Sequence, residues 1–75
     1  MTIEHLRVAQ QTRPFRPFTI HMADGRSFHI RHNEFLSHSP SGRTVIVYQN
    51  DDSFAILDIL LMTELAFPAT APAAQ

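Results

Sequence analysis

The stretch PFRPFTIHMADGRSFHIRH, residues 14–32, decides the fold because it predicts a β-hairpin that is entered through two prolines. Apolar and polar residues alternate on both sides of Asp24-Gly25, as they do in half-buried strands. A two-residue turn at Asp24-Gly25 would place apolar residues opposite polar ones. A three-residue loop, Ala23–Gly25, pairs Ile20 with Phe28 and keeps the apolar residues on one face. We therefore predict the three-residue loop, with Gly25 at positive φ.

The same register divides the hairpin into a buried and an exposed face. Thr19, His21 and His29 are expected to be exposed. Large β-branched and aromatic residues of the later strands complete the predicted core. The residues expected to be buried are Phe18, Ile20, Phe28, Ile30, Val45, Val47, Phe54 and Ile56.

The length of 75 residues indicates one small domain, predicted over residues 1–67, with a disordered tail over 68–75. The absence of cysteine excludes disulfides and thiolate chemistry. The sequence shows neither a secretory signal nor an apolar run long enough to span a membrane. These features predict a cytoplasmic, soluble protein without a membrane partner. A small core without covalent staples also favours oligomerisation.

Charge is unevenly distributed although the net charge is only −1. Residues 13–32 carry a net charge of +3, whereas residues 33–75 carry −4. All six basic residues are arginine, which suits bidentate contacts with carboxylate or phosphate. We define the basic hairpin as the predicted partner or nucleic-acid face, formed by Arg13, Arg16, His21, Arg26, His29 and Arg31.

The remaining elements follow in chain order. Thr2 is predicted to cap a short helix, which must end by Arg13 because that residue precedes a proline. After a polar turn region, residues 44–48 and 53–57 predict two antiparallel strands. A sharp corner at 58–61 and a closing strand at 62–67 complete the chain. The fold class is therefore mainly β (α+β): an N-terminal helix followed by a strongly bent, five-stranded antiparallel sheet, forming a small open barrel.

This element order resembles the topology of Sm-like (Hfq) and SH3-like small barrels. None of the nucleotide-pocket motifs of the Sm-like proteins is found, so no RNA-binding residue is carried over from them. A second resemblance rests on the phrases RPFxIHxADGRSFxIxH, SPSGRTVIVY and LLxTEL within residues 13–67. On these phrases the chain is similar to a group of short bacterial proteins, a resemblance that implies a bacterial source and no particular activity.

Three clusters contain residue types that are used in metal binding, catalysis or anion binding. His21 and His29 lie diagonally on one predicted face, but a closed metal site needs four ligands, so no metal and no cofactor are predicted. The stretch Ser37–Ser39 places serines beside a histidine without the carboxylate that a catalytic triad needs, so no enzymatic activity is predicted. Residues 41–44 could form a backbone nest that binds an anion, but a plain turn leading into a strand is the favoured interpretation.

Two functions remain as hypotheses. The leading one is a non-enzymatic protein-interaction module that forms a homo-oligomer or docks on another protein. It follows from strands that are apolar on both faces, because one interior covers only one face of each strand. The alternative is a nucleic-acid-binding small barrel, in which the basic hairpin with Phe15 and Phe18 forms a platform for single-stranded RNA.

Overall fold

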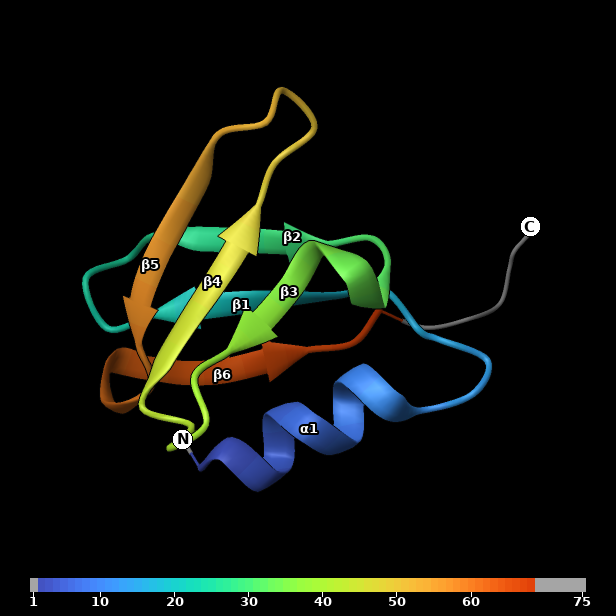
Figure 1. Cartoon of the computed structure of the whole chain (residues 1–75), viewed down its shortest axis with the longest axis horizontal. Coiled ribbons are helices and arrows are strands. Elements are labelled where there is room, and N and C mark those ends of the chain that lie inside the picture. The colour runs from blue at the N-terminus through green and yellow to red at the C-terminus, as the bar shows by residue number, and fades with distance from the viewer. Residues whose placement is uncertain (1, 69–75) are drawn as a thin grey trace.

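The computed structural model describes residues 2–68, so residues 69–75 of the predicted tail lie outside the described part (Figure 1). It contains one helix, six strands and two single-turn 3₁₀ helices, η1 and η2. In chain order these elements are α1 (Ile3–Gln11), β1 (Phe18–Met22), β2 (Ser27–Ile30), η1 (Asn33–Phe35), β3 (Leu36–His38), β4 (Thr44–Tyr48), β5 (Phe54–Asp58), η2 (Ile59–Leu61) and β6 (Met62–Ala66).

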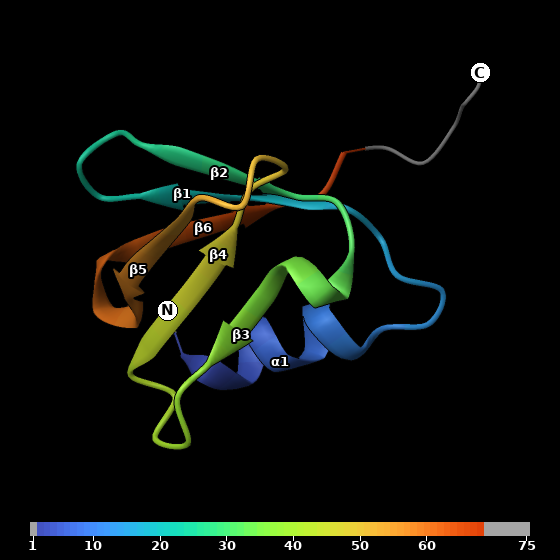
Figure 2. The same ribbon diagram turned by 45° about the horizontal axis from the view of Figure 1, so that its top comes forward.

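The strands form two three-stranded antiparallel sheets, with strand orders β2-β1-β6 and β3-β4-β5. The two sheets cross face to face, and α1 runs beside β6 and β3 (Figures 1 and 2). The predicted mainly β fold is confirmed, but the predicted single five-stranded sheet is wrong, and neither sheet closes into a barrel. The chain changes sheets at residues 31–35, where the Phe35 N–H donates to the His32 carbonyl (3.1 Å) in the 3₁₀ turn.

The predicted hairpin register is confirmed. Phe18 pairs with Ile30, and Ile20 pairs with Phe28, across β1 and β2. The Met22 N–H donates to the Arg26 carbonyl (2.8 Å), which closes the three-residue loop Ala23–Gly25. Gly25 has φ +93°, as the loop requires.

Helix α1 is attached through its side chains. Leu6 and Ala9 enter the core, because positions three residues apart share one face of a helix. The Gln10 side-chain amide donates to the carbonyls of Asn33 (3.0 Å) and Leu36 (2.7 Å), which ties α1 to η1 and β3. Thr2 stands at the N-cap position, but its hydroxyl contacts His5 Nδ1 (3.0 Å) rather than a backbone N–H.

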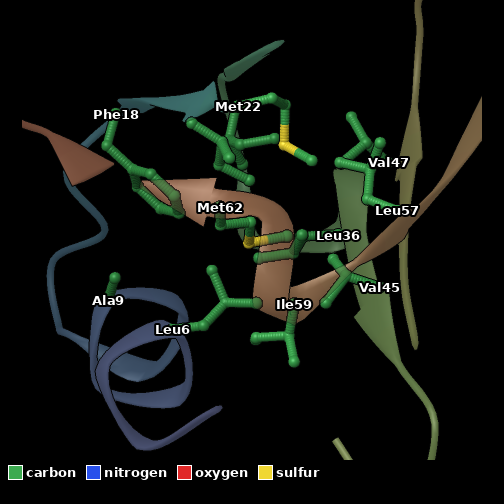
Figure 3. Close-up of a cluster of buried hydrophobic side chains, with 12 residues drawn as sticks. Leu6, Ala9, Phe18, Met22, Leu36, Val45, Val47, Leu57, Ile59 and Met62 are labelled. Atoms are coloured by element: carbon green, nitrogen blue, oxygen red, sulfur yellow. The ribbon is translucent and has the colours of Figure 1, made fainter. Parts of the chain in front are cut away.

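The core lies between the two sheets and is closed by α1 and η2 (Figure 3). Phe28, which is predicted to be buried, is only half-buried. Thr19 and His21, which are predicted to be exposed, are half-buried as well, whereas His29 is exposed as predicted. The described residues that form the core are Leu6, Ala9, Phe18, Ile20, Met22, Ile30, Leu36, Val45, Val47, Leu57, Ile59 and Met62.

The predicted burial of Phe54 and Ile56 is wrong. The β4–β5 register pairs Val45 with Leu57 and Ile46 with Ile56. Directly paired residues share a face, so once Val45 is inside, Leu57 must be inside and Ile56 outside. Phe54 and Ile56 are accordingly 59% and 65% exposed.

Candidate interaction surface

The outer side of β4 and β5 carries four apolar side chains, which we call the outer apolar face: Ile46, Tyr48, Phe54 and Ile56. The pairs Ile46–Ile56 and Tyr48–Phe54 lie directly across the two strands, so the four side chains form one contiguous block. The Tyr48 and Phe54 rings are tilted against each other with centroids 6.3 Å apart. Tyr48 is 39% exposed, and Phe54 and Ile56 are more so. A contiguous exposed patch of this kind marks an interaction site more than scattered apolar residues do.

Acidic residues flank this face at both ends. The β4–β5 turn holds Asp51 and Asp52, and Asp58 ends β5. The Asp51 carboxylate accepts hydrogen bonds from the hydroxyl (2.6 Å) and N–H (3.1 Å) of Ser53, and these bonds lower the pKa of Asp51 below 3.8. Asp52 adopts φ +72°, which bends the chain back into β5. The turn is therefore ordered by its own hydrogen bonds, which favour the charged form of Asp51.

The Asp24 carboxylate in the hairpin loop is held in a similar way. It accepts from the Arg26 N–H (3.0 Å) and from the Arg26 guanidinium (2.8 Å), and its pKa is lowered chiefly by the backbone hydrogen bond. In a carbon-detected NMR titration, we expect the carboxyls of Asp24 and Asp51 both to titrate below 3.8. Since the folded pKa lies below the unfolded one, this stabilisation is present above pH 3.8 and is lost as pH falls through the folded pKa. Carboxyls that titrate at or above 3.8 would show that these two turns are not formed in solution.

The basic hairpin does not form one continuous surface. Arg26 lies at the loop, ion-paired to Asp24 (2.8 Å) and placed over the Phe28 ring (5.5 Å to the centroid). Arg16 lies over the Phe67 ring (5.4 Å) and donates to the Pro68 carbonyl (3.1 Å). Arg13 precedes the first proline and is exposed.

The predicted aromatic partners of the basic hairpin are also misplaced. Phe18 is fully buried, and Phe15 is half-buried with its ring 5.9 Å from that of Phe18. Neither ring can serve as an open platform for bases. The structure places other aromatic residues, Phe35 and Tyr48, near Arg31 and His29.

These residues line a cleft of about 140 Å³ where β2, η1 and the end of β4 meet. Arg31 lies over the Phe35 ring (5.4 Å) and donates to Asn50 Oδ1 (2.7 Å). The cleft could not be predicted from the sequence, because the residues that line it are separated by up to 21 positions, from His29 to Asn50. We call it the Arg31 cleft; it is lined by His29, Arg31, Phe35, Tyr48, Gln49 and Asn50.

The two histidines of the hairpin are on one face, as predicted. His29 pairs with Thr19, whose hydroxyl lies 3.2 Å from His29 Nδ1, and His21 lies between Ser27 and Glu64 on the neighbouring strands. Within residues 2–68, no group of three histidine or acidic side chains is placed to hold a metal ion. His38 Nδ1 donates a hydrogen bond to the Ser39 carbonyl (2.8 Å) rather than contacting a serine hydroxyl.

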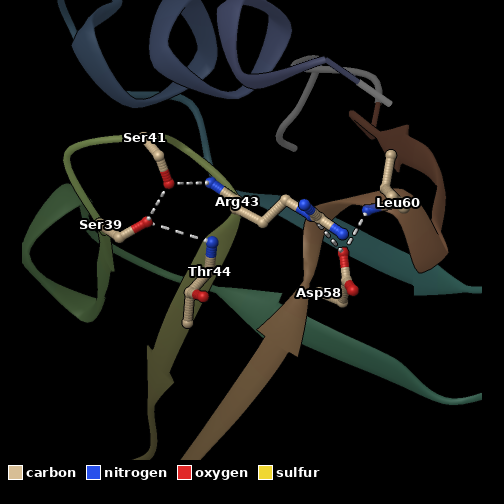
Figure 4. A network of polar contacts seen from close by, with 6 residues as sticks. All are labelled: Ser39, Ser41, Arg43, Thr44, Asp58 and Leu60. Atoms are coloured by element: carbon tan, nitrogen blue, oxygen red, sulfur yellow. Dashed lines mark hydrogen bonds and ion pairs between the residues drawn. The ribbon is translucent and has the colours of Figure 1, made fainter.

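The predicted alternative of an anion nest at residues 41–44 is not supported. The Ser39 and Ser41 hydroxyls lie 3.2 Å apart and accept the N–H groups of Thr44 and Arg43 (Figure 4). The Gly42 N–H donates to the Ser39 carbonyl (2.9 Å). These N–H groups are therefore used inside the turn. On the facing corner, the Asp58 carboxylate accepts from the Leu60 N–H (2.9 Å) and lies 4.0 Å from Arg43.

A second exposed apolar surface lies between α1 and β6. It is a groove of about 460 Å³ lined by His5, Val8, Thr63, Glu64, Leu65 and Phe67. Val8 projects from the helix and is 66% exposed. Within residues 2–68, the outer apolar face and this groove thus lie on different sheets, and Leu60 and Leu61 of η2 are exposed as well.

Comparison with protein-family models, curated proteins and solved structures gives no match for this chain. The resemblances drawn from the sequence therefore stay predictions, and function has to be inferred from geometry. Over residues 2–68, no helix combines the length and the apolar character needed to cross a bilayer.

Proposed function

We propose that this chain is a non-enzymatic interaction module that associates with copies of itself through the outer apolar face. The observation that carries the proposal is the pair Phe54 and Ile56, which are exposed by 59% and 65% beside Tyr48. Because both side chains are already partly buried, covering the exposed remainder would contribute about 1–2 kcal/mol each. Covering them with a second chain recovers that free energy.

A second copy is a better occupant than an unrelated protein because this chain carries complementary charges. The outer apolar face is flanked by Asp51, Asp52 and Asp58, and residues 33–75 carry −4 in total. Residues 13–32 carry +3, and their arginines lie before β1, in the β1–β2 loop and directly after β2. Attraction between these regions of two copies would orient their approach, so raising the salt concentration should slow assembly more than it weakens the assembled state.

The strand arrangement supports a finer proposal about architecture. The first and last strands, β1 and β6, pair with each other, and the 3₁₀ helix η2 makes the corner that leads into β6. We propose an open small barrel of the Sm-like kind, in which each of the two sheets is free to contact a neighbouring copy. This proposal would make the outer apolar face one side of the subunit interface.

The proposal can be tested by sedimentation velocity on the double variant Phe54→Ser, Ile56→Thr. We expect the wild type to sediment faster than a monomer of 8.5 kDa, and the double variant to dissociate at least about tenfold more readily. Val8→Thr is the matched control, because Val8 is as exposed (66%) as Ile56 (65%) but lies in the other apolar surface. Dissociation by Val8→Thr alone would move the interface to the α1–β6 groove and overturn the proposal.

A further inference from the structure

Arg31 keeps an uncompensated positive charge in the Arg31 cleft. The ion pairs recorded among residues 2–68 involve other arginines. Arg31 instead contacts two neutral groups, the Asn50 amide oxygen at 2.7 Å and the Phe35 ring at 5.4 Å. These contacts fix the position of the guanidinium without neutralising it. A fixed and uncompensated arginine is suited to an anionic ligand, above all a phosphate.

The cleft also offers aromatic surface next to this charge. Phe35 is half-buried under Arg31. Tyr48, 39% exposed at the end of β4, lines the cleft too, but it is shared with the outer apolar face, so a second copy on that face would compete with a ligand for this ring. Unpaired bases bind proteins by stacking on aromatic rings and on guanidinium planes. A volume of about 140 Å³ suits one planar ring rather than a larger ligand.

Side-chain amides complete the lining. Because Asn50 Oδ1 accepts from Arg31, the Asn50 amide nitrogen remains as a donor. Gln49 contributes a second amide, and His29 an imidazole whose Nδ1 is near Thr19. Amides and imidazoles supply the donors and acceptors that read the edge of a base. Two acidic residues belong to the segments around the cleft. Glu34 precedes Phe35 in η1 and takes part in none of the ion pairs formed among residues 2–68, and Asp51 directs its carboxylate to Ser53.

We propose that the Arg31 cleft binds one base of a single-stranded nucleic acid. The base stacks against the aromatic and guanidinium surfaces, and Arg31 attracts the adjoining phosphate. This inference goes beyond self-association, and it replaces the platform of Phe15 and Phe18 that the sequence suggested. Of the arginines in the basic hairpin, only Arg31 lines this cleft, together with residues of η1 and of the β4–β5 turn.

The test is fluorescence anisotropy with a fluorescein-labelled oligouridine of about twelve nucleotides, at about 50 mM salt. We expect the wild type to bind, and Arg31→Gln and Asn50→Asp each to weaken binding at least about tenfold. Asn50→Asp is nearly isosteric, and its new carboxylate would neutralise Arg31. The matched control is Arg43→Gln, which removes the same charge before the other end of β4 and should change the affinity by less than about twofold. Equal losses in the Arg31 and Arg43 variants would overturn the proposal, because they would indicate non-specific electrostatic binding.

Two further ligands show whether the protein binds the base itself or only the sugar–phosphate chain. An oligomer of the same length without bases should bind at least about tenfold more weakly, because stacking is lost. Free uridine monophosphate should compete only at much higher concentration, since it offers one base and no adjoining phosphodiester chain. The proposal would also be refuted if the wild type did not bind oligouridine, or if it bound the oligomer without bases equally well. Light scattering on Arg31→Gln shows whether the variant still self-associates. A loss of nucleic-acid binding can therefore be distinguished from a loss of self-association.

Discussion

Replacing Gly42 with alanine is expected to destabilise the fold by about 2–5 kcal/mol, which we would measure by urea unfolding. Gly42 has φ +76°, a conformation that strains a residue with a Cβ atom by about 1–2 kcal/mol. In addition, a Cβ atom at this position would lie 2.7 Å from Cβ and Cγ1 of Ile3. Such overpacking costs about 1–3 kcal/mol and can be relieved only if the start of α1 moves away.

The matched control for this prediction is Gly25→Ala. Gly25 also has a positive φ (+93°), but a Cβ atom there would meet no atom within 4 Å. We therefore expect Gly25→Ala to lose only the backbone contribution of about 1–2 kcal/mol. Equal losses at the two glycines would show that the turn at residues 39–43 does not pack against α1 as described. Both variants should be compared at one protein concentration, since assembly adds to apparent stability.

Replacing Phe18 with alanine is expected to cost about 3–5 kcal/mol in the free energy of unfolding. Phe18 is completely buried, and its ring packs 5.9 Å from that of Phe15 and 5.2 Å from that of Phe67. A chain of this length has a total stability of roughly 4–11 kcal/mol, so the variant would be partly unfolded if the total is at the low end. Thermal unfolding followed by circular dichroism would show the loss.

Phe54→Ala removes the same side chain from the outer apolar face. Since Phe54 is 59% exposed, we expect the stability of the dissociated chain to change by less than about 1 kcal/mol. The two phenylalanine variants together test the face assignment. A large loss at Phe54 in dilute solution, with a small loss at Phe18, would reverse it.

The hairpin was predictable because its sequence permits only one consistent register. Strict alternation on both sides of the loop means that a shift of one residue would move every apolar side chain to the wrong face. Gly25 then supplies the positive φ that the three-residue loop needs. Local pattern and turn chemistry therefore agree, and the structure confirms the result residue by residue.

The later strands were less predictable because they are apolar on both faces. In Phe54–Leu57, either alternate set could face the core, and the larger side chains of Phe54 and Ile56 favour the wrong choice. The pairing of Tyr48 with Phe54 across the β4–β5 turn decides the matter, and it depends on the conformation of that turn. Likewise, the division between β2 and β3 depends on the 3₁₀ turn at Asn33–Phe35, which no strong sequence signal marks as a change of sheet.

The sequence predicted which types of surface the protein has, but not which residues form them. The surplus of apolar strand surface was visible in the sequence, and it reappears as the outer apolar face, although with different members on β5. The basic hairpin was visible as well, but its sequence does not show which arginine forms an ion pair and which one lines a cleft. Arg26 is paired with Asp24 in its own loop, whereas Arg31 meets Asn50, 19 residues away. The cleft depends on that distant contact.

Multi-angle light scattering of the wild-type chain during gel filtration, at several concentrations, tests the central claim of self-association most directly. We predict a mass that is a multiple of 8.5 kDa at high micromolar concentration and that falls towards 8.5 kDa on dilution. A mass of 8.5 kDa at every concentration would contradict the account, because the outer apolar face would then remain in water.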